Sequence, residues 1–429
     1  MKIAFVSLGC AKNQVDTETM AGMLARAGHS VVLDESQAQA VIINTCSFIQ
    51  AATQESVDIL VEYAQLKAQG QLEKLVVCGC LAKRYAQELK SEIPEIDAFL
   101  GPQELEKIVQ VMGNGTNIAP VASARIYSTP PSYAYLKIAD GCNNRCSYCI
   151  IPSLRGPYRS RSRSAIIGEA RQIIAHGFHE IMLIAQDTTG FGLDTGEPVS
   201  GGRLEDLLAD LLELEGLGWL RLMYTYPTRI SDGLLEILSS HEKACPYLDL
   251  PLQHASDSVL ARMGRQGGKK KLYALTERIK SAGISLRTTF MVGFPGETEA
   301  EFQELLDFVR EVEFDHLGSF TYSPEEGTPA ASFPGQIPED EMQRRQEELM
   351  LLQQDISRRK LKALHGSVQQ VLVDGAAEED GFPFRGHTRR FAPEVDGTVY
   401  LNDPSLSPGQ LVQARIVNTT EYDLQAEVL

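Results

Sequence analysis

The amino-acid sequence predicts an α/β fold made of three successive parts. In the first third of the chain, short apolar runs alternate with amphipathic helical segments, which is typical of a parallel sheet covered by helices. The same alternation recurs between residues 133 and 334 as six further units, which favours an open, TIM-like partial (βα)6 barrel. From residue 366 onward, strand-like runs separated by Gly and Pro indicate a small antiparallel β-barrel.

The first part, residues 1–118, is expected to form a βαβ pattern that begins with the first buried strand of the chain. Its expected strands lie at residues 2–8, 40–45 and 74–77, and its expected helices at residues 15–28 and 51–68. Gly28 provides a suitable end for the first of these helices. Several Gly, Asn and Pro residues between positions 112 and 131 indicate a linker to the next part.

The second part, residues 124–360, is expected to carry the active site, because such barrels bind their ligands at the carboxyl ends of the strands. The expected strands lie at residues 135–138, 180–185, 219–225, 247–250, 285–292 and 316–322, with helices between them such as 203–214 and 299–312. A long polar helix at 339–364 is interpreted as a connecting or packing helix. The third part, residues 362–429, has expected strands at 368–373, 397–401 and 411–417.

Composition and charge restrict the class of protein. Hydrophobic residues make up 43% of the 429 residues, and no apolar run is long enough for a membrane-spanning helix. The first apolar run is too short for a secretory signal, and eight cysteines are too few for a disulfide scaffold, so we expect a reduced, cytoplasmic protein.

The net charge of −17 disfavours broad nonspecific binding to nucleic acid and suits a basic protein partner, although a simple need for solubility explains this charge equally well.

Three closely spaced cysteines follow the first strand of the second part. Cys142, Cys146 and Cys149 lie in the run Asp-Gly-Cys-Asn-Asn-Arg-Cys-Ser-Tyr-Cys. Three thiolates on one loop can bind a cubane iron–sulfur cluster and leave its fourth iron open for chemistry. A structural zinc site usually has two separated cysteine pairs, so zinc is the weaker alternative. These three cysteines are the expected catalytic residues.

Cys10, Cys46 and Cys80 form a second set, because each follows an expected strand of the first part. The carboxyl ends of parallel strands meet at one edge of a sheet, so these three thiols are expected to converge on a second metal site. Three ordinary buried cysteines, which behave as small hydrophobic residues, are the alternative.

The choice of Cys80 over Cys78 depends on position. The two residues face the same side of a strand, but Cys80 stands at the strand exit after Gly79, as Cys10 stands after Gly9. Cys78 and Cys245 are interpreted as structural.

With these motifs, the chain resembles the radical S-adenosylmethionine (SAM) methylthiotransferases over nearly its full length. The three parts match that family's N-terminal methylthiotransferase domain, radical SAM domain and TRAM domain. Residues 8–16, Leu-Gly-Cys-Ala-Lys-Asn-Gln-Val-Asp, and residues 150–161, Ile-Ile-Pro-Ser-Leu-Arg-Gly-Pro-Tyr-Arg-Ser-Arg, look like the branch that modifies an aspartate in the small-subunit ribosomal protein of the decoding centre. Members that act on transfer RNA tend to have Gln-Met-Asn after the first cysteine. Thr17, where serine is common, is a mild departure.

The resemblance implies two 4Fe-4S clusters and S-adenosyl-L-methionine as cofactors. The radical SAM loop would hold one cluster, and Cys10, Cys46 and Cys80 would hold the auxiliary one. Reductive cleavage of SAM would give a radical that abstracts hydrogen from the aspartate β-carbon, and the auxiliary cluster would present the sulfur, methylated by a second SAM. The implied partners are the basic ribosomal protein and an electron donor such as a flavodoxin or ferredoxin, with no membrane and a monomeric enzyme.

Several other residues are candidates for binding the cofactor. The resemblance places Tyr148 beside the adenine, and Gly293 and Gly296 would let the backbone approach SAM closely, unless they only form an ordinary turn. Candidates at the ends of other strands, without an assigned role, are Gln186, Asp187, Gln253 and His254, of which the histidine suits a structural role equally well.

Charged residues allow two further interpretations. Residues 362–429 contain five Lys or Arg against ten Asp or Glu, a net charge of −5, which suits a basic ribosomal protein better than transfer RNA. A basic cluster in this part either contacts ribosomal RNA or forms a solvated loop, and it comprises Arg385, His387, Arg389 and Arg390. Four arginines after the cysteine loop either shield a cluster and guide the substrate or form a solvated face, and they are Arg155, Arg159, Arg161 and Arg163.

Two alternative functions remain at this point. One is the same methylthiolation on an adenosine of transfer RNA. The other is a non-enzymatic zinc- or RNA-binding protein that uses the small barrel, which iron and sulfide analysis would distinguish from both enzymes.

Overall fold

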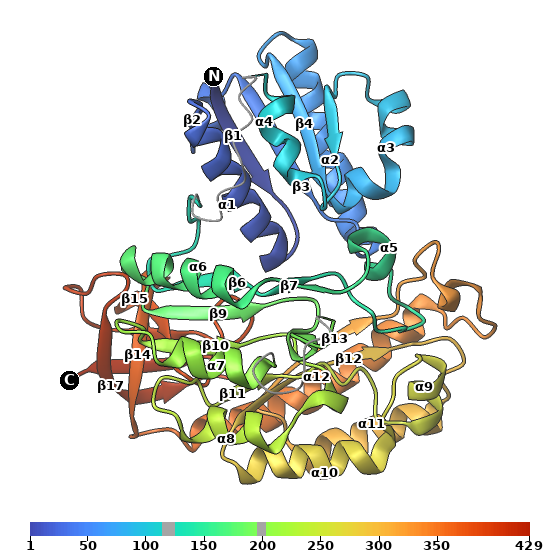
Figure 1. The fold of residues 1–429 in the computed structure, drawn as a ribbon. Coiled ribbons are helices and arrows are strands. Elements are labelled where there is room, and N and C mark those ends of the chain that lie inside the picture. Colours follow the sequence, from blue (N-terminus) through green and yellow to red (C-terminus); the bar gives the residue numbers. More distant parts are fainter. Residues whose placement is uncertain (114–124, 195–202) are drawn as a thin grey trace. The chain divides into compact units, whose positions relative to one another are not determined.

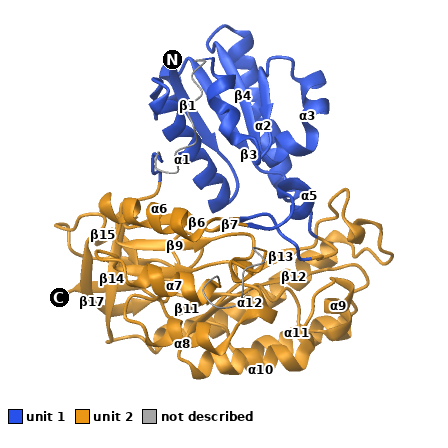
Figure 2. Cartoon of the chain, in the orientation of Figure 1, with its two compact units in different colours: residues 1–128, 140–144, 149–159 blue, residues 129–139, 145–148, 160–429 orange. Residues whose placement is uncertain are grey.

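The computed structural model describes residues 1–113, 125–194 and 203–429 (Figure 1). The chain divides into two compact units (Figure 2), and the segment that contains the cysteine loop contributes to both. Unit 1 comprises residues 1–128, 140–144 and 149–159, and unit 2 comprises residues 129–139, 145–148 and 160–429. Most of the expected linker at 112–131, and the boundary between residues 118 and 124, lie outside the described residues.

Unit 1 is built on a parallel sheet in the order β2-β1-β3-β4-β5, as the βαβ pattern predicts. Its strands are β1 (Lys2–Ser7), β2 (Ser30–Val31), β3 (Ala40–Thr45), β4 (Lys74–Gly79) and β5 (Ala98–Leu100). Its helices are α1 (Ala11–Arg26), α2 (Gln50–Ala68), α3 (Cys80–Glu92), α4 (Ile108–Val111) and α5 (Ile151–Arg155). Successive residues of β3 alternate between the two faces, so Val41 and Ile43 belong to one apolar core while Ala40 and Ile42 belong to the other.

Unit 2 contains six parallel strands in chain order, arranged as two three-stranded sheets, β10-β9-β6 and β11-β12-β13. An isolated parallel bridge joins Leu220 of the first sheet to Ala244, which precedes β11 of the second. The strands are β6 (Tyr133–Lys137), β9 (Glu180–Ile184), β10 (Trp219–Leu222), β11 (Tyr247–Asp249), β12 (Ser285–Val292) and β13 (His316–Thr321). The helices are α6 (Arg163–Ala175), α7 (Leu204–Leu212), α8 (Asp232–Ser240), α9 (Asp257–Arg262), α10 (Gly268–Ser281), α11 (Glu299–Val312) and α12 (Glu339–Lys362). Two short strands, β7 (Ala139–Asp140) and β8 (Arg159–Ser160), lie where the chain passes between the units.

The end of the chain forms a closed five-stranded barrel in the order β14-β15-β16-β18-β17, so the predicted fold class is confirmed. Its strands are β14 (Val368–Glu379), β15 (Phe382–His387), β16 (Val399–Leu401), β17 (Leu411–Thr419) and β18 (Leu424–Val428). All neighbouring pairs are antiparallel except β16 with β18, which run parallel. No helix of the described segments is long and apolar enough to cross a membrane.

The small barrel packs against the amino ends of the six-stranded region, opposite the rim where a barrel enzyme binds its ligands. Tyr133 and Tyr247, the first residues of β6 and β11, donate hydrogen bonds to Glu394 (2.5 Å) and Asp396 (2.7 Å) of the loop after β15. Arg221 of β10 donates to the carbonyl of Thr388 at 3.1 Å. This loop therefore covers the amino ends of the strands.

Part of the basic cluster of the small barrel is packed against the six-stranded region, which neither sequence-based interpretation expected. His387 is buried and lies 2.8 Å from Glu180 of β9, and Arg389 donates to the carbonyl of Ala244. Arg390 donates to the carbonyl of Gly283 at 3.0 Å. His387 and Arg389 are therefore held by the six-stranded region rather than forming a solvated loop or a free RNA-binding surface. Arg390 contacts the same region but is exposed, as is Arg385.

Candidate functional site

The first cysteine set lies at the carboxyl ends of three adjacent strands of unit 1. Cys10 immediately precedes α1, Cys46 follows β3, and Cys80 is the first residue of α3 after β4. Two glycines bring the connecting turns into contact. A Cβ on Gly9 (φ +95°) would lie 2.7 Å from the Cβ of Cys46, and one on Gly79 (φ +92°) would lie 2.5 Å from the carbonyl oxygen of Thr45. Only glycine fits these backbones, so the three turns converge at one edge of the sheet.

Polar side chains fix the strand ends beneath these cysteines. The Asn13 side-chain nitrogen donates to the carbonyls of Leu8 (2.8 Å) and Thr45 (3.1 Å), which precede the first two cysteines. The Ser56 hydroxyl accepts a hydrogen bond from the Cys46 amide (3.2 Å) and donates one to the Cys46 carbonyl (2.9 Å). Because buried polar groups that are fully bonded hold one geometry, the positions of these turns are well defined.

The thiols of this set influence one another electrostatically. Burial raises the pKa of Cys80 to about 11, the charge of Arg155 opposes that rise, and the charges of Cys46 and Cys10 add to it. Burial also raises the pKa of Cys46. Desolvation raises the pKa of the Cys10 thiol, but the charges of Lys12 and Arg155 and nearby backbone amides outweigh it, so its pKa is lowered. Three mutually repelling thiolates would be stabilised together by a positively charged metal centre.

Cys78 occupies a different environment from Cys80. It is fully buried in the apolar core beside Ile42 and Val76, and burial raises the pKa of its thiol. Within residues 1–113, 125–194 and 203–429, no group of three or more His, Cys, Asp or Glu side chains is closed around a metal position. The ligand sets at Cys10, Cys46 and Cys80 and at the cysteine loop therefore stay predictions.

The cysteine loop is divided between the two units. Cys142 and Cys149 belong to unit 1, where the amide of Cys142 donates to the carbonyl of Gly156 at 3.2 Å. The side-chain oxygen of Asn143 accepts a hydrogen bond from the Tyr158 amide at 3.0 Å. The first half of the loop is thus held by the segment that follows the loop.

Cys146 belongs to unit 2, where Ser147 anchors the loop. The amide of Ser147 donates to the carbonyl of Met263 (2.9 Å), and its hydroxyl donates to the carbonyl of Arg262 (2.8 Å). The next residue, Tyr148, packs edge-on against Phe294 with ring centres 6.5 Å apart. The side chain of Tyr148 is therefore held near the carboxyl end of β12, and its contact with the adenine stays a prediction.

Arg265 is a residue of this region that the sequence reading missed. Its guanidinium lies 3.8 Å from the Cys146 sulfur and 3.4 Å from the Tyr148 hydroxyl, and it donates to the carbonyl of Pro251 at 2.6 Å. It also lies over the Tyr226 ring, 4.7 Å from the ring centre. Arg265 lies three residues after α9, in the segment that follows β11. Its place after a barrel strand is the one feature of the sequence that could have indicated a role at this rim.

The other rim candidates have defined partners. Asp187 follows β9, forms an ion pair with Arg229, and accepts a hydrogen bond from the Thr189 hydroxyl at 2.6 Å. Gln186 beside it is half-buried. Gln253 adopts a positive φ of 75°, a strained conformation that non-glycine residues keep chiefly where the surrounding structure demands it.

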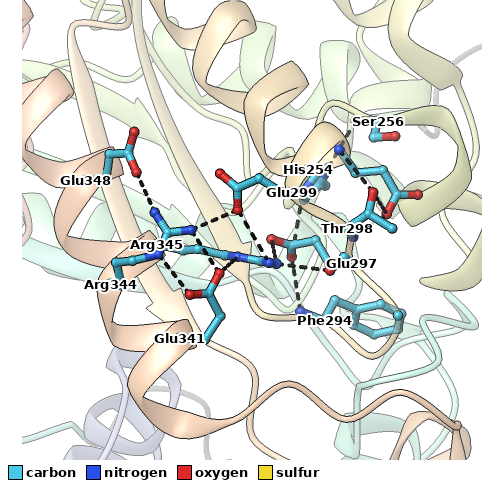
Figure 3. A network of polar contacts seen from close by, with 12 residues as sticks. His254, Ser256, Phe294, Glu297, Thr298, Glu299, Glu341, Arg344, Arg345 and Glu348 are labelled. Atoms are coloured by element: carbon cyan, nitrogen blue, oxygen red, sulfur yellow. Dashed lines mark hydrogen bonds and ion pairs between the residues drawn. The ribbon is translucent and has the colours of Figure 1, made fainter.

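The turn after β12 is fixed by α12. Arg345 donates to the Glu297 carboxylate at 2.8 Å, and Glu297 accepts from the Phe294 amide at 3.1 Å (Figure 3).

The two glycines of this turn differ in their surroundings. Met342 of α12 fills the space beside Gly293 (φ +74°) and would lie 2.2 Å from an added Cβ, whereas a Cβ on Gly296 would have no atom nearer than 3.8 Å. Packing against α12 therefore explains the glycine at position 293, and the approach of SAM to either glycine stays a prediction.

His254 is fully buried in this network, with its ring 3.8 Å from Glu297 (Figure 3). Burial lowers its pKa to about 3, so the ring is neutral, and its Nδ1 accepts a hydrogen bond from the Ser256 amide at 3.0 Å. These features fit a structural role.

The two cysteine sets are linked by the segment that follows Cys149. Ile150 and Leu154 form one buried apolar cluster with Cys80. Arg155, at the end of α5, forms ion pairs with Asp16 and Asp140, each at 3.0 Å. Of the four arginines after the loop, this one is buried, while Arg159 is exposed.

The comparisons with known proteins match the three parts of the chain. Residues 2–101 match the family described as "Uncharacterized protein family UPF0004", residues 136–309 the radical SAM superfamily, and residues 366–429 the TRAM domain. Among solved structures, the radical SAM methyltransferase TsrM from Kitasatospora setae has a TM-score of 0.56 at 14% identity, covering 74% of this chain and 72% of its own. The cobalamin-dependent enzyme OxsB has a TM-score of 0.52 at 13% identity, covering 82% of this chain and 56% of its own. These likenesses show the fold.

Curated relatives match the chain from end to end. The protein named ribosomal protein uS12 methylthiotransferase RimO is 45% identical in Syntrophotalea carbinolica, over 100% of this chain and 97% of that protein. The protein of the same name in Pelotomaculum thermopropionicum is 44% identical, over 100% of this chain and 99% of the relative. The chain therefore belongs to the uS12 methylthiotransferase family of radical SAM enzymes.

Proposed function

We propose that the protein adds a methylthio group to the β-carbon of an aspartate in the small-subunit ribosomal protein uS12. The main observation that supports this proposal is that Cys80 and Ile150 share one buried apolar cluster. Because Ile150 directly follows Cys149, this cluster connects the two cysteine sets. Transfer of sulfur to a carbon radical requires the sulfur source and the radical source to act on one bound substrate. The names of the full-length relatives supply the substrate.

The proposed cofactors are SAM and two 4Fe-4S clusters, one on Cys142, Cys146 and Cys149 and the other on Cys10, Cys46 and Cys80. When bound, they supply the reductive cleavage of SAM and the transferred sulfur. Ser147 and Arg265 would position the radical SAM loop, and Tyr148 would border the adenine. Asn13 would hold the strand ends beneath the auxiliary site. Further proposed contacts of SAM are Gly293, Gly296, Gln186 and Asp187.

The proposed partners are the basic uS12 protein and a flavodoxin or ferredoxin that donates electrons to a monomeric, cytoplasmic enzyme. The charge of −5 on residues 362–429 supports a basic substrate, since opposite charges favour encounter. We also propose domain limits of 1–118, 124–360 and 362–429. The second candidate substrate, an adenosine of transfer RNA, uses the same cofactors, and it is disfavoured by this charge.

The deciding experiment supplies the reconstituted enzyme, SAM and a reductant with uS12 or transfer RNA in separate reactions. Mass spectrometry should find a methylthio group on the uS12 aspartate and none on transfer RNA. The reverse result would overturn the substrate while leaving the enzyme class intact. About eight irons and eight labile sulfides per chain are expected, whereas zinc without sulfide would overturn the enzyme class.

A further inference from the structure

Arg155 follows the radical SAM loop in sequence, but its side chain lies at the other cysteine set. It is 3% exposed, and its guanidinium lies between Asp16 of α1 and Asp140. Asp16 is itself 4% exposed. One donor nitrogen bonds both carboxylates, and the second donates to the side-chain oxygen of Asn13 at 2.5 Å. Such a buried, multiply bonded arginine is fixed in place.

The partner of the second nitrogen connects Arg155 to the cysteine turns. While the Asn13 oxygen accepts from Arg155, its nitrogen donates to the carbonyls of Leu8 and Thr45. These carbonyls lie two residues before Cys10 and one residue before Cys46. Arg155 therefore orients the amide that ties two of the three cysteine turns together.

The backbone around Arg155 is held equally firmly. Its carbonyl accepts a hydrogen bond from the Gln103 side chain at 2.8 Å, and the preceding Leu154 packs with Cys80. The segment after Cys149 thus covers Cys80 with apolar atoms and brings one positive charge to the site.

We propose that Arg155 is a positioning residue of the auxiliary site, which orients the turns of Cys10 and Cys46 through Asn13 and brings a buried positive charge that raises the reduction potential of the cluster held there. The inference rests on the proposed auxiliary cluster. A cluster on thiolates gains negative charge when it is reduced, so a nearby fixed positive charge stabilises the reduced form and raises the potential. Removing that charge also leaves Asp16 and Asp140 without their shared partner, so the net charge of this buried region becomes more negative.

The test uses full-length protein in which Cys142, Cys146 and Cys149 are replaced by Ala, so that only the auxiliary cluster is reconstituted. In this background, Arg155→Gln, Arg155→Lys, Arg155→Gln with Asp16→Asn, and Arg159→Gln are compared. Arg159→Gln is the matched control, because it removes the same charge from an exposed position of the same segment. The readouts are iron and sulfide content, redox titration followed by electron paramagnetic resonance, and thermal unfolding of the apoprotein.

Arg155→Gln should shift the midpoint potential to more negative values, and the double variant should recover part of the shift. Arg155→Lys, which keeps the charge, and Arg159→Gln should stay near the parent potential. An Arg155→Gln potential equal to the parent's, or an equal shift in Arg155→Lys, would overturn the inference.

If Arg155→Gln does not fold or loses its iron, the iron content of the other variants decides. Iron retained by Arg155→Lys and by the double variant supports the role of the charge, and iron lost from both refutes it. Absence of the cluster from the parent would instead refute the proposed function.

Discussion

The Nε2 atom of His387 lies 2.8 Å from a carboxylate oxygen of Glu180, which places a histidine of the small barrel against the first residue of β9. Both side chains are buried, and the Nδ1 atom of His387 lies 2.9 Å from Asp374. Arg221 donates to the other oxygen of Glu180 at 2.6 Å. The interface between the small barrel and the six-stranded region is therefore a buried network of two cations and two carboxylates.

This network predicts that stability falls at alkaline pH. Burial lowers the pKa of His387, but the charges of Glu180 and Asp374 outweigh burial and raise it from 6.5 to about 9. A raised pKa contributes stability that is complete below pH 6.5 and is lost as the pH rises through 9. The loss is on the order of 3 kcal/mol. Chemical unfolding between pH 6.5 and 10 measures it, and His387→Gln should flatten the profile. A wild-type profile as flat as the variant's would show that the histidine is not charged in the folded protein.

Removing residues 366–429 should unfold unit 2 rather than merely weaken substrate binding. The deletion would leave Glu180 and Arg221 without Thr388, His387 and the rest of their cover. Exposing or unbalancing one such buried ion pair costs about 3–5 kcal/mol, a large part of the stability of a domain. The measurements are thermal unfolding and SAM cleavage without substrate. A truncated protein with the melting temperature and cleavage rate of the full chain would contradict this prediction.

Local patterns in the sequence predicted most elements, and α11 and β12 have the bounds that periodicity gives. The strands that the sequence reading missed in the small barrel had weak signals, since β15 contains Pro383 and Gly386 and β18 is short. Side-chain partners that are far apart in the sequence could not be predicted, for a different reason. Arg155 and Asp16 are 139 residues apart, and nothing near either residue specifies the other. The sequence indicated where the cysteines lie, but not which charged side chains surround them.

Arg265→Gln should reduce cleavage of SAM about 10- to 100-fold. Its guanidinium lies near the Cys146 sulfur and the Tyr148 hydroxyl, and a hydrogen bond to a charged group contributes about 1.5–3 kcal/mol. Release of 5′-deoxyadenosine measures the rate. Arg278→Gln is the control, because Arg278 pairs with the exposed carboxylate of Asp232 instead. Equal rates for both variants would remove Arg265 from the positioning of the loop.

The two cysteine sets should separate into two functions. Ala at Cys142, Cys146 or Cys149 should abolish 5′-deoxyadenosine formation while the auxiliary iron is retained. Ala at Cys10, Cys46 or Cys80 should spare that cleavage but stop sulfur insertion. Iron content and both products are assayed on each variant. Cys78→Ala is the control, because its sulfur lies in the apolar core, and loss of auxiliary iron in this variant alone would reverse the choice between Cys78 and Cys80.

Gly79→Ala should destroy the auxiliary site, whereas Gly70→Ala should only lower stability. Both glycines have positive φ, 92° and 76°, so each substitution introduces backbone strain of about 1–3 kcal/mol. They differ in the space around them. A Cβ at position 79 would lie 2.5 Å from the Thr45 carbonyl oxygen, while one at position 70 would meet no atom within 4 Å.

To relieve the clash between this Cβ and the Thr45 carbonyl, the turn before Cys80 must move away from the turn before Cys46. Iron content after reconstitution should therefore fall by about half in Gly79→Ala, since one of two equal clusters is lost, and remain at the wild-type level in Gly70→Ala. Full iron content in Gly79→Ala would mean that the auxiliary site does not depend on the close approach of these two turns.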